Sequence, residues 1–361
     1  MNFPAFRSAR RCAAAALTAC VASFALVACG GGDDDTPAYT TTVSFGDSLS
    51  DVGTYRTATV AQLGGGKYTV NGGGPIWVER VAADRGLAAP CAAQVGLVSS
   101  GPLAAFAQTP TTQPSCNGYA QGGARVTNPV GPGNAALLAL GDSSGALGQL
   151  TVPVTTQMDR WLAANGGRFN GRELVLVLAG GNDLFINLGS IGASPGQITA
   201  QQAVANMGVA GGELATLVRT KLLANGAKFV VVVNLPDVSL TPFALGLDAP
   251  SQGLINTMST TFNTQLAAGL NGVADVLYVD AYTRGRDQAA RASFYGFTNV
   301  ATPACNLAAL QPSTSLICTT STLIPGDTSR YAYADGVHPT PYSHQLLADY
   351  VLARMSEVGW R

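Results

Sequence analysis

Two unbroken apolar runs constrain the fold of this chain more than any other feature. They read LVLVL at residues 174–178 and FVVVV at residues 229–233. A strand with one solvated face alternates apolar and polar residues, whereas a run that is apolar at every position is typical of a strand buried on both faces. Such strands belong to parallel sheets that helices cover on both sides. Shorter runs at residues 40–45 and 276–279 are expected to complete the sheet.

Helical patterns separate these runs. The segment that opens at Pro75 places Trp77, Val78 and Val81 on one helical face. Further helices are expected at residues 154–164, 201–224, 254–270 and 342–357. Strands that alternate with helices predict a three-layer α/β/α sandwich with a central, mostly parallel sheet. Since no linker interrupts residues 40–361, we expect them to form a single domain.

The first 28 residues predict a signal peptide of the bacterial lipoprotein type. Basic residues come first, and an apolar run at residues 13–28 follows that is too short to span a membrane comfortably. Cys29 follows a Leu-Val-Ala triplet that resembles a lipobox, so we expect this cysteine to carry a lipid. Gly30 after it resembles outer-membrane sorting, and residues 29–39 predict a flexible, polar tether. The alternative is an ordinary signal peptide with an incidental cysteine.

The charge balance argues against a nucleic-acid partner. Removal of the leader leaves 17 basic and 21 acidic residues, a net charge of −4. A chain that tracks phosphates needs a basic surface, and this one has only three lysines. Charged residues make up 11% of the chain, whereas Gly, Ala, Ser and Thr are common. The expected surface is polar through hydroxyls and amides, as suits an exported protein.

Four cysteines downstream of the leader are candidates for disulfides. They are Cys91, Cys116, Cys305 and Cys318, and four cysteines permit three connectivities. We expect local pairing, Cys91 with Cys116 and Cys305 with Cys318, because each pair brackets a segment rich in Gly, Pro, Ser and Thr. Free buried thiols are the alternative, which an oxidising compartment disfavours.

Residues 90–148 and 298–334 resist the alternating pattern, and the second region shows no convincing periodic element. Long loops in a compact domain are usually functional. The second region leads directly to Asp335 and His338. We therefore expect it to border the functional site.

A serine and a histidine stand where acyl-transfer chemistry would need them. Ser48 directly follows the first expected strand, and His338 has Asp335 three residues before it. A serine hydroxyl is a poor nucleophile until a base takes its proton, and an imidazole works best when a carboxylate holds its tautomer. The chain has two histidines, so the only other candidate base is His344. Reactive groups in open parallel sheets gather at the carboxyl ends of the strands, which favours Ser48.

Other residues with similar signatures receive simpler interpretations. Ser143 also follows a Gly-Asp pair, but the preceding residues 135–140 indicate a helix or loop rather than a strand, so we expect an ordinary loop serine. His344 falls on the last expected helix and is interpreted as a surface or structural histidine. Asp47 and Asp183 are expected to bond backbone groups and position their neighbours. Two histidines and paired cysteines offer no ligand cluster, so no metal is expected.

The tetrahedral intermediate of acyl transfer needs hydrogen-bond donors aimed at its oxygen. Candidates are the backbone N–H of Ser48, a backbone N–H near Gly122 and Gly123, and the side-chain amide of Asn182. Glycine lets the backbone approach a substrate closely. Each of these features alone also fits a purely structural role, since the two glycines suit a plain turn and Asn182 suits a helix N-cap.

In this order, the four segments resemble the GDSL family, also called SGNH hydrolases. The resemblance places Ser48 in the first conserved block, Gly123 in the second, Asn182 in the third, and Asp335 with His338 in the last. It implies a flavodoxin-like sandwich with Ser48, His338 and Asp335 as the catalytic triad. It also implies Ser48, Gly123 and Asn182 as the oxyanion hole, with the choice between Gly122 and Gly123 left open.

One branch of that family is a closer match. The blocks that resemble bacterial lecithinase/haemolysin-type enzymes are residues 73–79, 119–125, 234–237 and 335–340. Members are secreted or surface esterases, lipases, phospholipases A and acyltransferases, and some carry a disulfide-closed loop that Cys305 and Cys318 resemble. The resemblance implies a secreted or surface esterase or lipase that acts on lipid or phospholipid esters without a cofactor. We also expect it to be monomeric, and Cys29 and Gly30 predict its anchoring to the outer membrane.

Three alternatives remain. Two are enzymes on the same fold, a glycerophospholipid acyltransferase and a carbohydrate O-deacetylase. The third is a non-catalytic surface lipoprotein that keeps the fold as a binding module, which filled catalytic positions disfavour.

Overall fold

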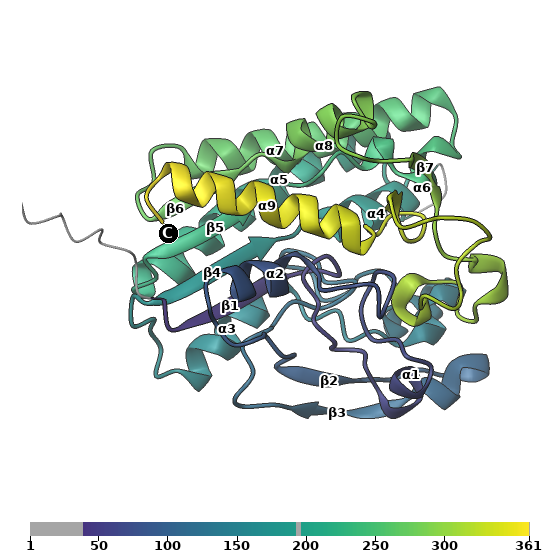
Figure 1. The fold of residues 1–361 in the computed structure, drawn as a ribbon, viewed down its shortest axis with the longest axis horizontal. Helices are drawn as coiled ribbons and strands as arrows, with labels where there is room; N and C mark the ends of the chain where they lie inside the picture. Colours follow the sequence, from purple (N-terminus) through teal and green to yellow (C-terminus); the bar gives the residue numbers. More distant parts are fainter. Residues whose placement is uncertain (1–38, 193–195, 361) are drawn as a thin grey trace, which may run out of the picture. The chain divides into compact units, whose positions relative to one another are not determined.

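Residues 39–192 and 196–360 are described by the computed structural model of the chain (Figure 1). The expected leader, the expected lipidation site Cys29 and nearly all of the expected tether lie outside the described residues.

Four parallel strands form the central sheet in the order β1 (Thr41–Gly46), β4 (Glu173–Leu178), β5 (Phe229–Val233) and β6 (Val276–Val279). One cross-strand row shows the register, since Val43 pairs with Val175, Val175 with Val230, and Val230 with Val276. All carboxyl ends therefore meet at one edge of the sheet. The expected parallel α/β sandwich is confirmed.

A fifth segment, residues 117–121, runs parallel to the outer edge of β1. The N–H of Ser44 donates to the Asn117 carbonyl at 3.1 Å, and the N–H of Tyr119 donates back to the Ser44 carbonyl at 2.8 Å. The N–H of Gln121 continues the ladder to the Gly46 carbonyl at 3.1 Å. With this segment on one side of β1 and β4 on the other, the strand order reverses at β1. Ligands of doubly wound sheets bind at such a reversal.

Helices cover both faces of the sheet and explain its unbroken apolar strands. On one face, Val175 and Val177 pack against α3 (Val154–Ala164), α5 (Ala200–Leu217) and α7 (Ala249–Leu270). On the other face, Leu174 and Leu176 pack against α2 (Trp77–Asp84) and α9 (Pro341–Glu357), which lie in front of the sheet in Figure 1. Because alternate side chains of β4 point to opposite layers, residues 174–178 of this strand are all apolar.

The remaining helices and strands are short, and several of them line the cleft described below. They are α1 (Ala58–Gln62), β2 (Gln94–Leu97), β3 (Gln108–Thr112), α4 (Gly181–Gly189), α6 (Pro242–Leu245), α8 (Ala281–Ala290), β7 (Asn299–Pro303) and β8 (Tyr331–Tyr333). Short 3₁₀ helices are η1 (Gly101–Phe106), η2 (Ala135–Leu140), η3 (Ser143–Leu147), η5 (Leu223–Asn225), η6 (Val238–Leu240), η7 (Leu307–Ala309) and η8 (Ser315–Ile317), and η4 (Val218–Leu222) is a π-helical turn.

The two regions expected to be irregular contain short regular elements. In the first, β2 and β3 form an antiparallel pair, and in the second, β7 and β8 form a parallel pair. The prediction of no periodic element at residues 298–334 is therefore wrong. The pairs stand apart from the central sheet, and β7 is only partly covered, so its residues lack the alternation that marks a half-buried strand.

Two helix boundaries differ from the expected ones. Helix α7 begins at Ala249, five residues early, because the Asp248 side chain accepts the Ser251 N–H and caps the helix. Helix α5 ends at Leu217, and the helical stretch continues through η4 and η5 before Gly226, whose left-handed conformation ends it.

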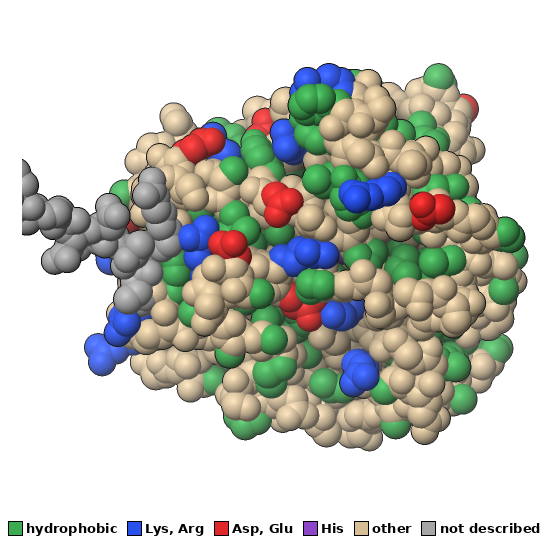
Figure 2. Space-filling model, viewed as in Figure 1, with side chains coloured by type: hydrophobic (Ala, Val, Ile, Leu, Met, Phe, Trp, Pro, Cys, Tyr) green, Lys and Arg blue, Asp and Glu red, His purple; other side chains and the backbone are tan. Residues whose placement is uncertain are grey.

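Charged side chains are scattered over the face of the molecule drawn in Figure 2, where acidic and basic groups lie singly or beside one another within a larger uncharged surface. Within residues 39–192 and 196–360, no helix is both long and apolar enough to cross a bilayer.

Candidate active site

Ser48 lies in the turn that follows β1, and a buried glutamine fixes the start of that turn. Gln157 of α3 accepts the Gly46 N–H through Oε1 and donates Nε2–H to the Gly46 carbonyl, both at 2.8 Å. One oxygen of the Asp47 carboxyl then accepts the Leu49 N–H at 3.0 Å. The last residue of β1 is thereby held from the side by α3. This role of Gln157 leaves no sequence signal, since its helix reads as an ordinary amphipathic one.

The structure brings Ser48, His338 and Asp335 into one chain of contacts. His338 Nε2 lies 2.9 Å from Ser48 Oγ, and His338 Nδ1 lies 2.9 and 2.8 Å from the two carboxyl oxygens of Asp335. Burial alone would raise the pKa of Asp335. The charge of His338, together with hydrogen bonds from His338 and the Ser315 N–H, outweighs burial and holds that pKa below its usual range. An ionised carboxylate can only accept, so Nδ1 carries the proton and Nε2 is left to accept from Ser48.

The turn that carries His338 is closed by Asp335 itself. One oxygen of this carboxylate accepts the N–H groups of Val337 and His338 at 2.9 and 2.8 Å. The ring of Tyr68 stacks on the imidazole with centroids 4.8 Å apart. The hydrogen bonds and the stacked ring together restrict the rotation of the imidazole. Sequence reasoning missed Tyr68, whose contact joins residues far apart in the chain.

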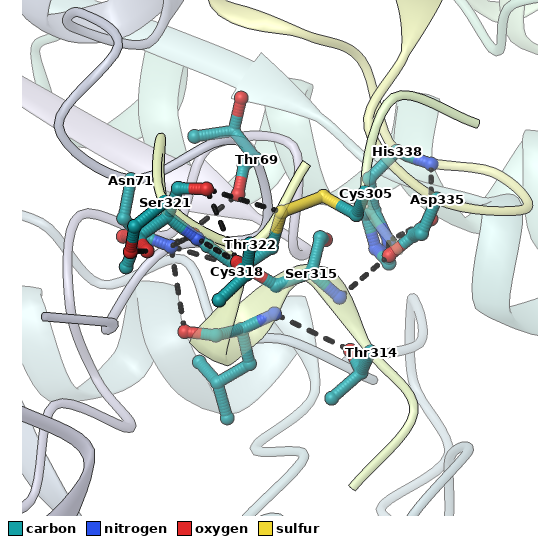
Figure 3. The surroundings of a disulfide bond; sticks show 12 residues. Thr69, Asn71, Cys305, Thr314, Ser315, Cys318, Ser321, Thr322, Asp335 and His338 are labelled. Carbon is teal, nitrogen blue, oxygen red and sulfur yellow. Dashed lines mark hydrogen bonds and ion pairs between the residues drawn. A yellow bond between two sulfur atoms is a disulfide. The ribbon is translucent and has the colours of Figure 1, made fainter. Parts of the chain in front are cut away.

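A disulfide lies beside the same turn and supports it (Figure 3). Cys305 pairs with Cys318, the local pairing that the sequence favoured. At one end of the closed loop the Cys305 N–H donates to the Ala334 carbonyl at 2.9 Å. At the other end the Ser315 N–H donates to an Asp335 oxygen at 3.0 Å. Asn71 holds the loop further, donating Nδ2–H to the Cys318 carbonyl at 3.0 Å.

The other favoured pair, Cys91 with Cys116, is also a disulfide. It precedes the 117–121 segment and so lies at the end of the sheet away from Ser48. The two disulfides therefore brace different parts of the molecule.

Three groups near Ser48 are arranged as hydrogen-bond donors. Among the described residues, neither the Ser48 N–H nor the Gly123 N–H has an acceptor. The Asn182 side chain donates one Nδ2 hydrogen to the Ala124 carbonyl at 2.9 Å, which leaves its second hydrogen. The Gly122 N–H, in contrast, is taken by the Asp51 carboxyl at 2.9 Å.

The loop that carries Gly123 is tied to both neighbouring turns. Asp51, three residues beyond Ser48, accepts the Gly122 N–H, and Asp183, next to Asn182, accepts the Val126 N–H at 3.0 Å. Burial raises the pKa of both carboxyls, although these hydrogen bonds oppose the shift. Asp183 thus positions its neighbours as expected. Asp51 was not anticipated, because nothing in the sequence connects it to Gly122.

Gly123 cannot be replaced without strain. Its φ is +76°, a left-handed conformation that favours glycine, and a Cβ there would lie 2.5 Å from the Pro132 carbonyl oxygen. Both the backbone conformation and the close packing therefore require a residue without a side chain at this point.

Ser48, Gly123, Asn182 and His338 all line one cleft of about 290 Å³. Much of the rest of its wall is apolar, with Leu49, Phe185, Leu235, Val238, Phe297, Val300, Val337 and Leu347 among the lining residues. Asp47 also borders the cleft, and burial raises the pKa of its carboxyl to about 7, although the Leu49 N–H and the charge of His338 partly offset the shift. Of the described residues between 305 and 318, none lines the cleft, so the disulfide loop supports Asp335 without shaping the pocket itself.

The competing residues fall elsewhere. Ser143 is exposed, starts the short helix η3 and is not part of the cleft wall. His344 is buried with 1% exposure, so of the two expectations the surface one is wrong. Its Nδ1 accepts the Trp77 N–H at 3.4 Å, and burial together with the charge of His338 lowers its pKa to about 3. A neutral, internal His344 packs α9 against α2, where Trp77 is also fully buried.

Comparison with known proteins identifies the family to which this fold belongs. The profile of the GDSL-like lipase/acylhydrolase family matches residues 43–351. The chain therefore belongs to this family.

The individual relatives share less than a third of their aligned residues with this chain. Esterase EstA of Pseudomonas aeruginosa is 28% identical over 332 residues, which cover 88% of this chain and 47% of EstA, and EstA of Pseudomonas putida matches equally. A GDSL esterase/lipase of Arabidopsis thaliana is 28% identical over 146 residues, covering 36% of this chain and 39% of the plant protein. The chain spans less than half the length of each of these relatives.

Proposed function

We propose that this chain is a serine esterase that hydrolyses carboxylic esters through an acyl-enzyme. The observation that carries the proposal is the 2.9 Å contact between Ser48 Oγ and His338 Nε2, with Asp335 on the opposite ring nitrogen. A hydroxyl, a base and an orienting carboxylate in this geometry form the arrangement that activates a serine.

In the proposed reaction, Ser48 Oγ attacks the ester carbonyl while His338 Nε2 takes its proton. The negative charge on the former carbonyl oxygen is held by the N–H groups of Ser48 and Gly123 and by the Asn182 amide. The tetrahedral intermediate then collapses, and His338 returns the proton to the leaving alcohol. Water repeats the sequence on the acyl-enzyme, releasing the acid and the free serine. Gly123 is the better donor candidate than Gly122, whose N–H is already bonded to Asp51.

The proposed substrates are esters with lipid acyl chains. The support is the apolar wall of the cleft beside Ser48, because an apolar wall stabilises hydrocarbon and offers few partners for a sugar. This lining favours an acyl esterase over a carbohydrate O-deacetylase. Transfer of the acyl group to an alcohol other than water would use the same acyl-enzyme.

We also propose that the protein is exported and anchored by a lipid on Cys29, on the outer membrane. The pattern of the first 28 residues supports this location. The two disulfides add support, since such bonds persist in oxidising compartments.

The proposal is tested by assaying p-nitrophenyl esters with the wild type, Ser48→Ala and Ser143→Ala. Ser48→Ala should fall to near background, whereas the matched Ser143→Ala variant should stay within a few-fold of wild type. Hydrolysis that survives Ser48→Ala in a pure, folded protein would refute the assignment.

A further inference from the structure

One face of helix α8 forms a wall of the cleft that also contains Ser48. The cleft-lining residues of this helix are Ala281, Arg284, Gly285, Gln288 and Ala289. Their spacing of three and four residues places them on a single helical face. Three of them, Ala281, Gly285 and Ala289, are small and lie four residues apart in one row, with Arg284 and Gln288 beside that row. Residues from β7, β8 and α9 also line the cleft, among them Val300, Ala332, Tyr333 and Leu347.

Gly285 in the middle of this face has no internal reason to be glycine. It lies inside α8 and is not among the residues with positive φ. Within the described part of the chain, a Cβ at Gly285 would meet no heavy atom within 4 Å. Glycine also weakens a helix relative to alanine. A glycine that neither the backbone nor a protein neighbour requires, on the wall of a cleft, leaves room for a ligand.

Helix α8 is held firmly in place, so the space beside it does not depend on a mobile element. Asn234, at the end of β5, accepts the Tyr282 N–H at 2.9 Å and donates to the Asp280 carboxyl that caps the helix at 2.8 Å. Arg286 donates to the buried carboxyl of Asp237 at 2.5 Å. The Asn-Leu-Pro-Asp block at residues 234–237 thus positions one wall of the cleft.

Two polar side chains, Arg284 and Gln288, share this wall. Arg284 is partly engaged, and among the described residues its buried Nε has no hydrogen-bond partner. Arg284 donates Nη1–H to the Tyr295 hydroxyl at 3.0 Å, and its guanidinium lies 4.6 Å from the centre of that ring. The remaining surface offered to a ligand is largely hydrocarbon from Ala281, Ala289, Val300 and Leu347.

We propose that the cleft along the Ala281–Gly285–Ala289 face of α8 is the acyl subsite, which takes a medium- or long-chain acyl group. This inference rests on the esterase function proposed above and names its substrate class. Moving one methylene from water into an apolar site corresponds to roughly a fourfold change in binding. Contacts with α8 should therefore determine which acyl chain lengths the enzyme prefers. A side chain added at Gly285 should shorten the longest acyl group that the cleft accepts.

The test measures kcat/KM for p-nitrophenyl acetate and octanoate, with thermal unfolding of every variant. The wild type should prefer octanoate. Gly285→Leu should lower the octanoate-to-acetate ratio by roughly 10-fold or more, the discrimination typical of a blocked methylene pocket. Gly285→Ala should lower the ratio less and unfold at the same or a higher temperature, because alanine favours the helix. If Gly285→Leu misfolds, Ala289→Leu on the same face serves in its place.

Gly253→Leu is the matched control, since Gly253 lies in α7, is exposed, has the same free space around its Cβ and does not line the cleft. Its ratio should equal that of wild type. If Gly285→Leu and Ala289→Leu both fold and keep the wild-type octanoate-to-acetate ratio of kcat/KM, the proposed acyl subsite is wrong, although the proposed esterase function still stands. Calorimetric binding of decanoic acid separates the two proposals. If the wild type hydrolyses no ester but binds decanoic acid, and Gly285→Leu abolishes that binding, the proposed esterase function is wrong and the proposed acyl subsite is supported. If the wild type does not bind the acid, the proposed acyl subsite is wrong.

Discussion

Ser48 and Asn182 are positioned by the central sheet, whereas Asp335 and His338 lie outside it on a separately braced turn. The first two follow β1 and β4, adjacent strands whose register is fixed by six residue pairs. The second two follow β8, which belongs to a two-stranded pair, and their turn is held by the disulfide loop and the ring of Tyr68. The proposed nucleophile and its oxyanion donors therefore belong to a rigid scaffold, and the proposed base is held by contacts that a few substitutions can remove.

This difference predicts how substitutions act in the two regions. On the sheet side, removal of a donor should subtract one interaction from the transition state and leave the rest in place. On the other side, removal of a brace touches no reacting atom, so any loss of activity must come from displacement of His338. A displacement of about 1 Å can cost on the order of 10²-fold in rate.

The largest of these effects is expected for Asn182→Ala. The amide would be lost from the oxyanion hole, and kcat should fall by about 10²–10³-fold with KM changed much less. Steady-state kinetics on p-nitrophenyl esters measure both constants.

Asn187→Ala is the control on the same helix. Asn187 is also buried and donates to the Asp183 carbonyl at 2.9 Å, but it does not line the cleft. Its substitution should lower stability and leave kcat within a few-fold of wild type. If Asn182→Ala changed only KM, Asn182 would bind substrate rather than the oxyanion.

The next effect is expected for the double variant Cys305→Ser with Cys318→Ser. Opening a loop of this length should cost about 3 kcal/mol of stability. Because the loop holds Asp335 through the Ser315 N–H, kcat should also fall, by up to about 10²-fold. Thermal unfolding, kinetics and thiol counts under denaturing conditions check the three parts.

Cys91→Ser with Cys116→Ser sharpens that comparison. This disulfide closes a loop with a sequence separation of 25 residues, so its removal should cost a similar free energy of unfolding, about 3 kcal/mol. It lies at the opposite end of the sheet from Ser48, and kcat should change little. An equal loss of kcat in both double variants would mean that the bridge beside Asp335 has no special role.

The smallest effect concerns stability and Asp47. Its folded pKa of about 7 lies above the ordinary value of 3.8, so the unfolded chain releases this proton first as pH rises. Asp47 therefore makes stability fall between about pH 4 and pH 7. Asp47→Asn keeps an acceptor for the Leu49 N–H and removes the titration, so its stability should decline less over this range. The difference from wild type should be on the order of 2 kcal/mol between pH 5 and 7. Denaturant unfolding at several pH values measures it, and parallel curves would contradict the raised pKa.

The sheet side was also the part that the sequence predicted best. Strands buried on both faces can be recognised in the sequence as unbroken apolar runs. The positions of Ser48 and Asn182 follow from the rule that parallel strands have their carboxyl ends at one edge of the sheet. The two disulfide pairings followed from the segments rich in Gly, Pro, Ser and Thr that each pair of cysteines brackets. Residues 117–121 were missed as a strand because one short ladder beside β1 leaves no periodic pattern.

What the sequence did not reveal are the contacts between distant residues that support the site. Asp51 holds the Gly122 N–H from 71 positions away, and Gln157 bonds Gly46 from 111 positions away. The stacking of Tyr68 on His338 and the row of small α8 residues along the cleft likewise cannot be predicted from the sequence. The local sequence pattern predicts helices and strands, whereas these contacts depend on how the helices, strands and loops pack against one another.

The central claim, that His338 and Asp335 activate Ser48, is tested most directly by labelling with a fluorophosphonate and mapping the modified peptide by mass spectrometry. The wild type should carry the label on Ser48, and His338→Ala should label far more slowly while remaining folded. A label on Ser143, or labelling of Ser48 at an unchanged rate in His338→Ala, would contradict the account.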